Sequence, residues 1–374
     1  MKIAQVTEFF APWAGGISEH VGHLTLELRA LGHEVHVLTS RHRCGGAPVD
    51  DELERFTHRF GTAVQFPYNG SMANITYSFN LPRRLDALLE REGFDIIHVH
   101  NPMTPTLPLL TLDRSPALNV GTFHAFHKTE HMIVMWRHVL RPRMRRLHLN
   151  LAVSAAARDA YQHYFDAPFE IVPNGIDLRR FRPNGHVPAA NGEQSLLFVG
   201  QLVPKKGLLT LLDAFELLLD EFPRLRLQVV GDGPLRDACH RRLGPRARER
   251  VEFLGQQHGP RLVELYQTCD VFCAPSIGHE SFGITLLEAM AAGKPIVASR
   301  IAGYLDVVRD GFEAVLHRSA DVRDLRDTLR HVVTDGALRS RLASQALRTV
   351  QRYAWPGVAR EIESRYERLL RECC

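Results

Sequence analysis

Residues 195–234, SLLFVGQLVPKKGLLTLLDAFELLLDEFPRLRLQVVGDGP, carry the strongest indication of the fold. Two apolar runs of strand length, Ser195–Val199 and Leu225–Val230, flank a predicted helix at Gly207–Leu219. A strand, a helix and a second strand in this order form a parallel pair joined by a crossover helix. The stretch therefore predicts a parallel sheet that is covered by helices.

The same alternation continues in both directions along the chain. Before this stretch we expect elements at Lys2–Thr7, Ile17–Leu31, Glu34–Thr39, Phe94–His100, Leu118–Phe123, Leu149–Val153 and Phe169–Val172. After it we expect elements at Pro234–Leu243, Val251–Leu254, Val271–Ala274, Gly283–Ala292 and Pro295–Ala298, and mostly helix over Asp321–Leu370. Two such blocks predict an α/β protein with two doubly wound, Rossmann-like domains facing across a cleft.

Composition excludes several classes of protein. Hydrophobic residues make up 45% of the chain and charged residues 24%, which excludes a disordered, collagen-like or disulfide-scaffold chain. No apolar run approaches the about 20 residues that span a membrane, and the first residues read as a strand rather than a secretion signal. The net charge of +4 gives no sign of nucleic-acid binding, and the six scattered cysteines suit reduced thiols. We therefore expect a cytoplasmic protein.

Ligands of open parallel sheets bind at the carboxyl ends of the strands, so the loops after the strands hold the candidate site. Gly15 and Gly16 precede a helix whose free amides suit an anion. The alternative is that the two glycines only form a tight turn. Lys205 and Lys206, in the loop after Ser195–Val199, suit a diphosphate. The alternative for this second loop is a solvated surface loop.

Two further loops follow strands of the second block. Gly231, Asp232 and Gly233 keep the sheet edge open, which is a weak signal by itself. The stretch GHESFGITLLEAMAAGKP at 278–295 is more informative, because Glu280 precedes a helix and Glu288 lies two turns along it. Carboxylates with this spacing can hold different ends of one extended ligand. Helix capping with an exposed Glu288 is the alternative, but a carboxylate in an apolar stretch needs a partner.

One histidine of the first block is a candidate. His124 follows Leu118–Phe123, on the same predicted sheet edge as Gly16, where structural and functional roles are equally open. His98 and His100 share one face of a strand, and we expect His100 and Asn101 to line or support the cleft.

With these residues in place, the chain resembles the retaining glycosyltransferases of family 4, which have the GT-B fold. The matching pieces are GG at 15–16, FDIIHVH at 94–100, VPNGID at 172–177, KKG at 205–207, VGDGP at 230–234 and ESFGITLLEAMAAG at 280–293. Two prolines, a glycine and two asparagines over residues 172–184 indicate irregular backbone, and we place the domain boundary there. The resemblance then implies an acceptor-binding domain over residues 1–178 and a donor-binding domain over residues 179–356. It also implies that a last helix, residues 357–374, returns to the first domain, and the apolar stripe of Val358, Ile362 and Tyr366 needs such a partner.

The resemblance also implies roles for individual residues. The donor-binding set is Gly15, Gly16, Gln201, Lys205, Lys206, Gly231, Asp232, Glu280, Phe282, Gly283, Ile284 and Glu288. Within this set Lys206 holds the diphosphate, Glu280 the sugar hydroxyls and Glu288 the ribose hydroxyls. His124 lies beside the anomeric carbon and forms the catalytic set with Glu280 and Lys206. Gln201 departs from the family, where many relatives carry arginine, and it leaves more of the charge neutralisation to the lysines.

A closer resemblance is to the phosphatidylinositol α-mannosyltransferases, through PYNGS at 67–71, TFH at 122–124, LRP at 140–142 and CAP at 273–275. It implies that Tyr68, Asn69, Ser71 and His124 bind the acceptor. The expected reaction moves mannose from GDP-mannose to a lipid-linked or phosphorylated acceptor such as phosphatidylinositol. No D-x-D motif and no nucleophile stand out, so we expect no metal or cofactor, and front-face attack rather than a covalent intermediate. The alternatives are a UDP-sugar with a soluble saccharide acceptor, a sugar-nucleotide 2-epimerase, and a non-catalytic nucleotide-binding protein.

Arginines alternate with apolar residues between positions 131 and 148. Basic amphipathic helices attract anionic headgroups at about 1 kcal/mol per basic residue, which predicts a peripheral contact with the inner face of the cell membrane. The candidate residues are Arg83, Arg84, Arg137, Arg141, Arg143, Arg145 and Arg146. A solvated helix face, or a grip on a phosphorylated soluble acceptor, is the alternative.

Overall fold

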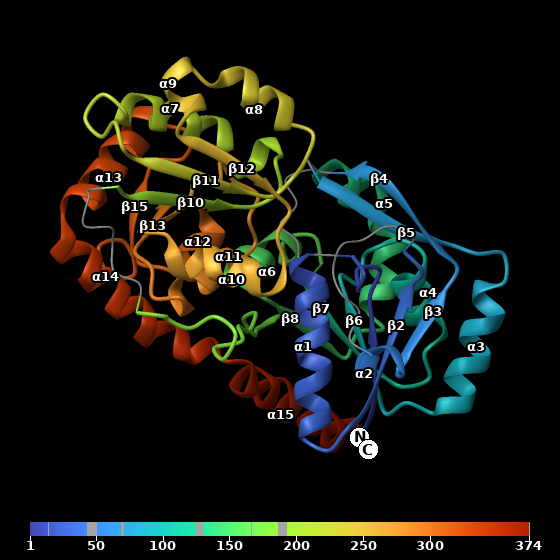
Figure 1. The fold of residues 1–374 in the computed structure, drawn as a ribbon. Helices are drawn as coiled ribbons and strands as arrows, with labels where there is room; N and C mark the ends of the chain where they lie inside the picture. Colours follow the sequence, from blue (N-terminus) through green and yellow to red (C-terminus); the bar gives the residue numbers. More distant parts are fainter. Residues whose placement is uncertain are drawn as a thin grey trace. The chain divides into compact units, whose positions relative to one another are not determined.

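The computed structural model describes residues 1–13, 15–42, 51–68, 71–124, 130–165, 167–185 and 193–373 (Figure 1). The chain divides into two compact units, Met1–Gly175 with Trp355–Cys374, and Ile176–Ala354. Ile176 donates its N–H to the carbonyl of Tyr353 at 2.8 Å, within the second unit. The Trp355 ring packs on Gly175, where a Cβ would lie 2.3 Å from it, within the first unit. These contacts place the boundaries at residues 175 and 355, rather than at 178 and 357.

The first unit is built on a seven-stranded sheet in the order β3-β2-β1-β6-β7-β8-β9, in which all neighbouring strands are parallel. Its strands are β1 (Lys2–Val6), β2 (Glu34–Ser40), β3 (Thr57–Phe60), β6 (Ile96–His100), β7 (Leu118–Phe123), β8 (Leu149–Ala152) and β9 (Glu170–Ile171). Its helices are α1 (Gly16–Ala30), α2 (Asp51–Glu54), α3 (Leu81–Glu92), α4 (Leu107–Arg114), α5 (Glu130–Met144), α6 (Ala155–Gln162) and α15 (Trp355–Cys373). An antiparallel pair, β4 (Thr62–Tyr68) and β5 (Ser71–Tyr77), stands apart from the sheet.

The second unit has a six-stranded parallel sheet in the order β12-β11-β10-β13-β14-β15. Its strands are β10 (Ser195–Val199), β11 (Arg226–Val230), β12 (Val251–Gly255), β13 (Val271–Ala274), β14 (Ile296–Ser299) and β15 (Ala314–His317). Its α-helices are α7 (Leu208–Leu218), α8 (Arg236–Arg242), α9 (Pro245–Arg248), α10 (Gly259–Thr268), α11 (Ile284–Ala291), α12 (Ala302–Leu305), α13 (Val322–Thr334) and α14 (Gly336–Thr349). Two 3₁₀ turns, Pro204–Lys206 and Val350–Tyr353, complete the unit.

The two sheets share one topology, and it confirms the predicted pair of Rossmann-like domains. In each sheet the strand order reverses beside the first strand, between β1 and β6 in the first unit and between β10 and β13 in the second. A reversal of this kind separates the loops that leave the two neighbouring strands and opens a crevice at their carboxyl ends. The candidate loops at Gly15–Gly16 and Lys205–Lys206 both follow strands at these reversal points.

The last helix returns to the first unit, as predicted. In Figure 1, α15 lies beside α1 near the two termini. Its buried residues Val358, Ile362 and Tyr366 join one apolar cluster with Ile3 of β1 and Leu24 of α1. The helix begins at Trp355 rather than at Gly357, because Pro356 fits the first turn of a helix, where no backbone N–H is needed.

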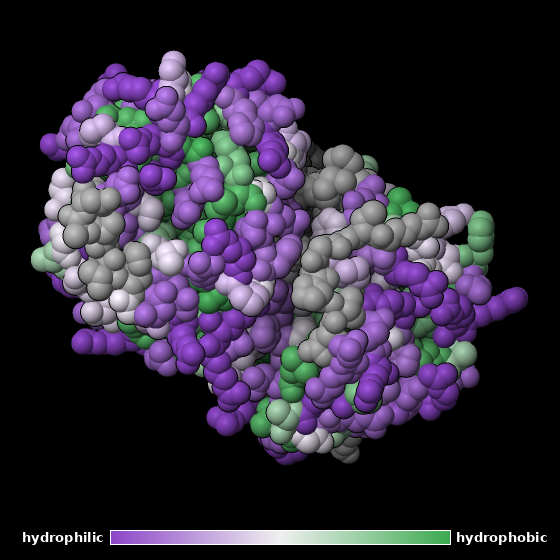
Figure 2. Space-filling view, viewed as in Figure 1, coloured by the Kyte–Doolittle hydropathy of each residue, from purple (hydrophilic) through white to green (hydrophobic). Residues whose placement is uncertain are grey.

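The surface seen in Figure 2 is largely hydrophilic over both units, with apolar residues in small, separate patches. The apolar residues gather inside each unit, in clusters on the faces of the two sheets. Within the described ranges of the chain, no helix combines the length and the hydropathy that a membrane crossing needs.

We expect the packing of α15 to stabilise the first unit measurably. Ile362 is buried between α15 and the sheet, so Ile362→Ala leaves a cavity and should lower the unfolding free energy by about 2–5 kcal/mol. Urea unfolding of both proteins measures the difference. Arg371→Ala, at an exposed position near the end of the same helix, is the matched control. An unchanged midpoint for Ile362→Ala would mean that α15 adds nothing to the first unit.

Candidate functional site

In the second unit, a close backbone contact joins the loop after β10 to the loop after β13. Gly207 has φ of +69°, and a Cβ there would lie only 1.9 Å from the carbonyl oxygen of Pro275, so a side chain cannot be accommodated. Beside this contact, Ile277 donates its N–H to the carbonyl of Lys205 at 2.8 Å. The two loops are therefore held together by backbone atoms on both sides of the reversal point.

This contact brings the predicted lysines to the predicted carboxylate. The ammonium of Lys206 lies 3.0 Å from Oε1 of Glu280, and both side chains are mostly buried. Burial lowers the pKa of Lys205, the positive charge of Lys206 lowers it further, and the negative charge of Glu280 acts in the opposite direction. Two lysines and one carboxylate leave net positive charge here, and a phosphate is the ligand that such a site favours.

The start of α11 adds backbone donors to the same region. Gly283 precedes the helix with φ of +95°, and a Cβ there would lie 2.7 Å from the ring of Tyr304. Phe282 is buried, and Glu280 is in the loop just before it. No side chain among the described residues caps this helix, so the first amides, from Ile284 onward, suit an anion.

Glu288, two turns into α11, has the partner that its apolar surroundings require. The hydroxyl of Tyr266, on α10, donates to Oε2 of Glu288 at 2.6 Å. Burial and the nearby carboxylate raise the pKa of Tyr266 well above its ordinary value, so the phenol keeps its proton and remains a donor. Glu280 and Glu288 are thus fixed before and within one helix, where they can contact different parts of one ligand.

The third loop of this unit is held by its own residues. Gly231 has φ of +130°, and a Cβ there would lie 1.9 Å from the carbonyl oxygen of Gly200. The Asp232 carboxylate accepts the N–H of Gly233 at 2.8 Å and lies 3.5 Å from Arg236. Gln201 is exposed beside this loop, and the Leu202 N–H donates to the carbonyl of Asp232 at 2.9 Å. The Asp232 side chain therefore orders its own turn.

In the first unit, the candidate residues lie near β1, β6 and β7. Gly15 and Gly16 stand at the start of α1, which no side chain among the described residues caps. His124 directly follows β7, and its backbone N–H donates to the side-chain oxygen of Asn101 at 2.9 Å. Asn101 therefore holds the backbone at the point where the loop after β7 begins.

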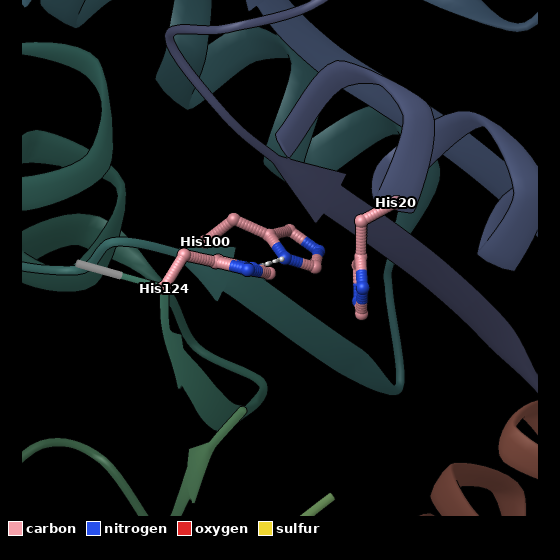
Figure 3. A group of neighbouring side chains, drawn as sticks. All are labelled: His20, His100 and His124. Carbon is pink, nitrogen blue, oxygen red and sulfur yellow. Dashed lines mark hydrogen bonds between the residues drawn. The ribbon is translucent and has the colours of Figure 1, made fainter. Parts of the chain in front are cut away.

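Three histidines form a buried cluster in this unit. Nε2 of His124 lies 2.9 Å from Nδ1 of His100, and Nε2 of His100 lies 2.6 Å from Oε1 of Gln5. In Figure 3, the rings of His100 and His124 lie next to each other, and His20 reaches toward them from α1. Nδ1 of His20 bonds to the side chain of Asn174 at 2.9 Å. Burial lowers the pKa of His20 to about 4 and keeps the pKa values of His100 and His124 well below their ordinary range.

The prediction from sequence did not include His20, Gln5 or Glu8. His20 lies one helical turn after Gly16, and this spacing is the signal that could have identified it. The buried carboxylate of Glu8 accepts hydrogen bonds from both hydroxyls of Thr76 and Thr106, each at 2.7 Å, and from the Leu107 N–H at 3.1 Å. Glu8 thereby ties the β4–β5 pair to α4.

The predicted acceptor residues occupy the turn of the β4–β5 pair. Tyr68 and Ser71 face each other across the last pair of the ladder. Asn69 lies outside the described residues, and so do the side chains of Tyr68 and Ser71. Their contacts with an acceptor therefore stay a prediction.

Comparison with known proteins identifies similar sequences over the whole chain. The family model "Glycosyltransferase Family 4" matches residues 14–180, and "Glycosyl transferases group 1" matches residues 185–349. The chain is 32% identical to a phosphatidyl-myo-inositol mannosyltransferase of Mycolicibacterium smegmatis, covering 98% of this chain and 94% of the relative. It is 29% identical to a D-inositol 3-phosphate glycosyltransferase of Kribbella flavida, covering 94% and 90%. The sucrose-phosphate synthase structure from Thermosynechococcus elongatus has the same fold, with a TM-score of 0.78, 20% identity and 99% of each chain covered.

We expect the histidine cluster to make folding sensitive to acid. The pKa of His20 falls from an ordinary 6.5 to about 4 in the folded chain, so the unfolded state binds a proton more readily. The stabilisation is complete above pH 6.5 and is lost as the pH falls toward 4, where His20 alone should cost about 3 kcal/mol of unfolding free energy. Urea unfolding between pH 7.5 and 4 measures this loss.

A substitution pair isolates the contribution of the cluster. His20→Gln cannot take up the proton and should reduce the pH dependence by the His20 share, whereas His98, His100 and His124 keep theirs. His163→Gln, at an exposed position of the same unit, should leave the pH dependence unchanged. Equal pH dependence in the wild type and His20→Gln would show that His20 is not buried in its neutral form.

Proposed function

We propose that this chain, which belongs to glycosyltransferase family 4 and is a glycosyltransferase, moves mannose from GDP-mannose to a hydroxyl of an inositol phospholipid, with retention of configuration. The observation that carries the proposal is the Lys206–Glu280 ion pair of 3.0 Å at the reversal point of the second sheet. The 32% identity to a phosphatidyl-myo-inositol mannosyltransferase supports the choice of mannose and of a lipid acceptor.

In the proposed reaction, the main task of the second unit is to stabilise the departing nucleoside diphosphate. Negative charge grows on the diphosphate while the anomeric carbon gains oxocarbenium character. Lys206, Lys205 and the first amides of α11 provide preorganised positive charge and hydrogen bonds for it. This set needs no metal ion for the step. The sugar hydroxyls bind Glu280, and the ribose hydroxyls bind Glu288, which Tyr266 holds in place.

In the first unit, the proposed acceptor site includes His124 and the turn of the β4–β5 pair. Tyr68, Asn69 and Ser71 bind the phosphorylated inositol, and His124 lies beside the reacting carbon. Front-face attack by the acceptor hydroxyl then retains the configuration without a covalent enzyme intermediate.

The acceptor we propose resides in a membrane, so the first unit also needs a membrane contact on the cytoplasmic side. Arg137, Arg141 and Arg145 are exposed along and just after α5, and the apolar side chains of Met135 and Trp136 are exposed beside them. Arg83 and Arg84 add exposed charge at the start of α3. Three of the seven predicted arginines have contacts within the fold. Arg143 pairs with Asp113 at 2.7 Å, Arg146 donates to the carbonyl of Ser115, and Arg84 donates to the carbonyl of Arg59 at 3.3 Å.

A soluble phosphorylated inositol is the second candidate acceptor. The observation that favours it is the similarity to the D-inositol 3-phosphate glycosyltransferase of Kribbella flavida. The same arginines would then bind the phosphate of a free acceptor.

We expect a donor and acceptor panel to distinguish these reactions. GDP-mannose with phosphatidylinositol vesicles should give labelled lipid, and UDP-glucose and UDP-N-acetylglucosamine should give far less. Transfer to inositol 3-phosphate in place of the lipid would favour the second candidate. Epimerised sugar without transfer to either acceptor would contradict both.

Loss of the ion pair should affect turnover more than folding. Lys206→Ala and Glu280→Ala should each lower kcat about 100- to 1000-fold, because each removes a preorganised charge from the reacting groups. Melting temperatures show whether the variants fold. Arg242→Ala, which breaks an exposed ion pair with Asp213 in the same unit, is the control and should keep full activity. Turnover within threefold of wild type in either variant would refute the assignment of this site.

Membrane binding should depend on the exposed arginines of the first unit. The triple variant with Arg137, Arg141 and Arg145 changed to Gln should sediment less with phosphatidylinositol vesicles, most clearly at low salt. A variant with Arg241, Arg341 and Arg348 changed to Gln loses the same charge from the second unit and should bind as wild type does. If wild-type protein stays in the supernatant at low ionic strength, the membrane contact is wrong.

A further inference from the structure

Three side chains form a continuous hydrogen-bonded line across the first sheet. Gln5 is on β1, His100 ends β6 and His124 directly follows β7, and these three strands are neighbours in the sheet. The distances are 2.6 Å from Gln5 Oε1 to His100 Nε2, and 2.9 Å from His100 Nδ1 to His124 Nε2. All three side chains are buried, so these bonds have no competition from water.

The direction of each bond follows from its chemistry. An amide oxygen can only accept, so His100 carries its proton on Nε2 and donates it to Gln5. A neutral imidazole has one proton, so Nδ1 of His100 is a bare acceptor. The hydrogen bond between the rings then requires the proton of His124 to be on Nε2. Nδ1 of His124 is left with a free lone pair.

We propose that Gln5 and His100 are positioning residues, which hold His124 in the Nε2–H form so that its Nδ1 accepts a hydrogen bond from a substrate hydroxyl. The inference rests on the proposed function, in which His124 lies beside the reacting carbon. No partner for Nδ1 is recorded in the part of the chain that the structure describes. A ring in the other tautomer would present an N–H there, and it could not accept from a hydroxyl.

The surroundings of the pair keep both rings neutral and in place. The titratable groups that the described structure packs around them are His20 from α1, His98 from β6 and Tyr366 from α15. Burial lowers the pKa of His98 to about 3 and that of His20 to about 4, so neither adds a charge near neutral pH. Trp355 from α15 packs edge-on against His20.

The same three histidines could in principle bind a metal ion, because one nitrogen from each of His20, His100 and His124 lies within 4.8 Å of the others. The hydrogen bonds favour the positioning role. A metal would have to replace the proton between His100 and His124, which already join at 2.9 Å. A zinc ion bound to the purified protein is therefore one of the results that would contradict the positioning role.

The central experiment compares two substitutions at Gln5. Gln5→Leu removes the acceptor and frees the tautomer of His100, so kcat should fall about 100-fold while the KM for the donor stays the same. Gln5→Glu still accepts from His100 and should retain most of the wild-type kcat. Its negative charge raises the pKa of the neighbouring imidazoles, so the acid limb of the kcat profile should move to higher pH. Val35→Ala, a buried change in the same sheet, controls for lost stability.

A second measurement tests the tautomer without any assay of activity. Nitrogen-15 spectra of histidine-labelled protein, with the His124 signals assigned by difference from His124→Gln, should show Nδ1 without a proton and Nε2 with one. A proton on Nδ1, an unchanged kcat in Gln5→Leu, or one zinc ion per chain in the purified protein would each overturn the inference. If the wild type transfers no sugar from any donor in the panel, the proposed function fails, and the spectra still decide the state of His124.

Discussion

The backbone contact between Gly207 and Pro275 is the constraint from which the site of the second unit follows. A Cβ at position 207 would lie 1.9 Å from the Pro275 carbonyl oxygen, so only glycine lets the two loops meet. Their meeting places Lys206 at 3.0 Å from Glu280, although 73 residues lie between the two positions in the chain. The hydrogen bond from the Ile277 N–H to the Lys205 carbonyl joins the same two loops and reinforces this approach.

The first unit differs from the second in that it buries several polar side chains within its sheet. Gln5, His100 and His124 lie where apolar residues would pack more simply, and each is tolerated because it bonds to its neighbour. Neutral imidazoles suit such a place, because they donate and accept without the desolvation that a charge would suffer. The result is a rigid set of rings whose protonation is determined by a single amide oxygen.

The two units therefore suit different parts of the proposed reaction. The second unit concentrates fixed positive charge, which a departing diphosphate needs. The first unit offers an uncharged, ordered histidine, which can orient a hydroxyl without binding an anion in its place. Exposed arginines of α5 lie outside this cluster, and a lipid surface or a phosphate is the partner that their charge favours.

The sequence alone was enough to predict the architecture and the loops that bear the chemistry. Apolar runs of strand length alternate with helical segments, and this local pattern is set by which residues avoid water, so β7, β10 and β13 agree with their predicted bounds. The glycines and lysines of the candidate loops were also identified from the sequence, because turn-forming residues act within a short stretch of the chain. The returning helix α15 was predicted from its apolar stripe, although its start at Trp355 was not.

The partners of the polar residues came only from the tertiary structure. Tyr266 is 22 residues from Glu288, Gln5 is 95 from His100, and Glu8 is 68 from Thr76. The local sequence of these residues does not indicate the partner, because each hydrogen bond exists only after helices, loops or strands distant along the chain have packed together. The pairing of β1, β6 and β7 therefore determines which nitrogen of His100 and of His124 carries the proton. The sequence by itself showed only that the histidines were present.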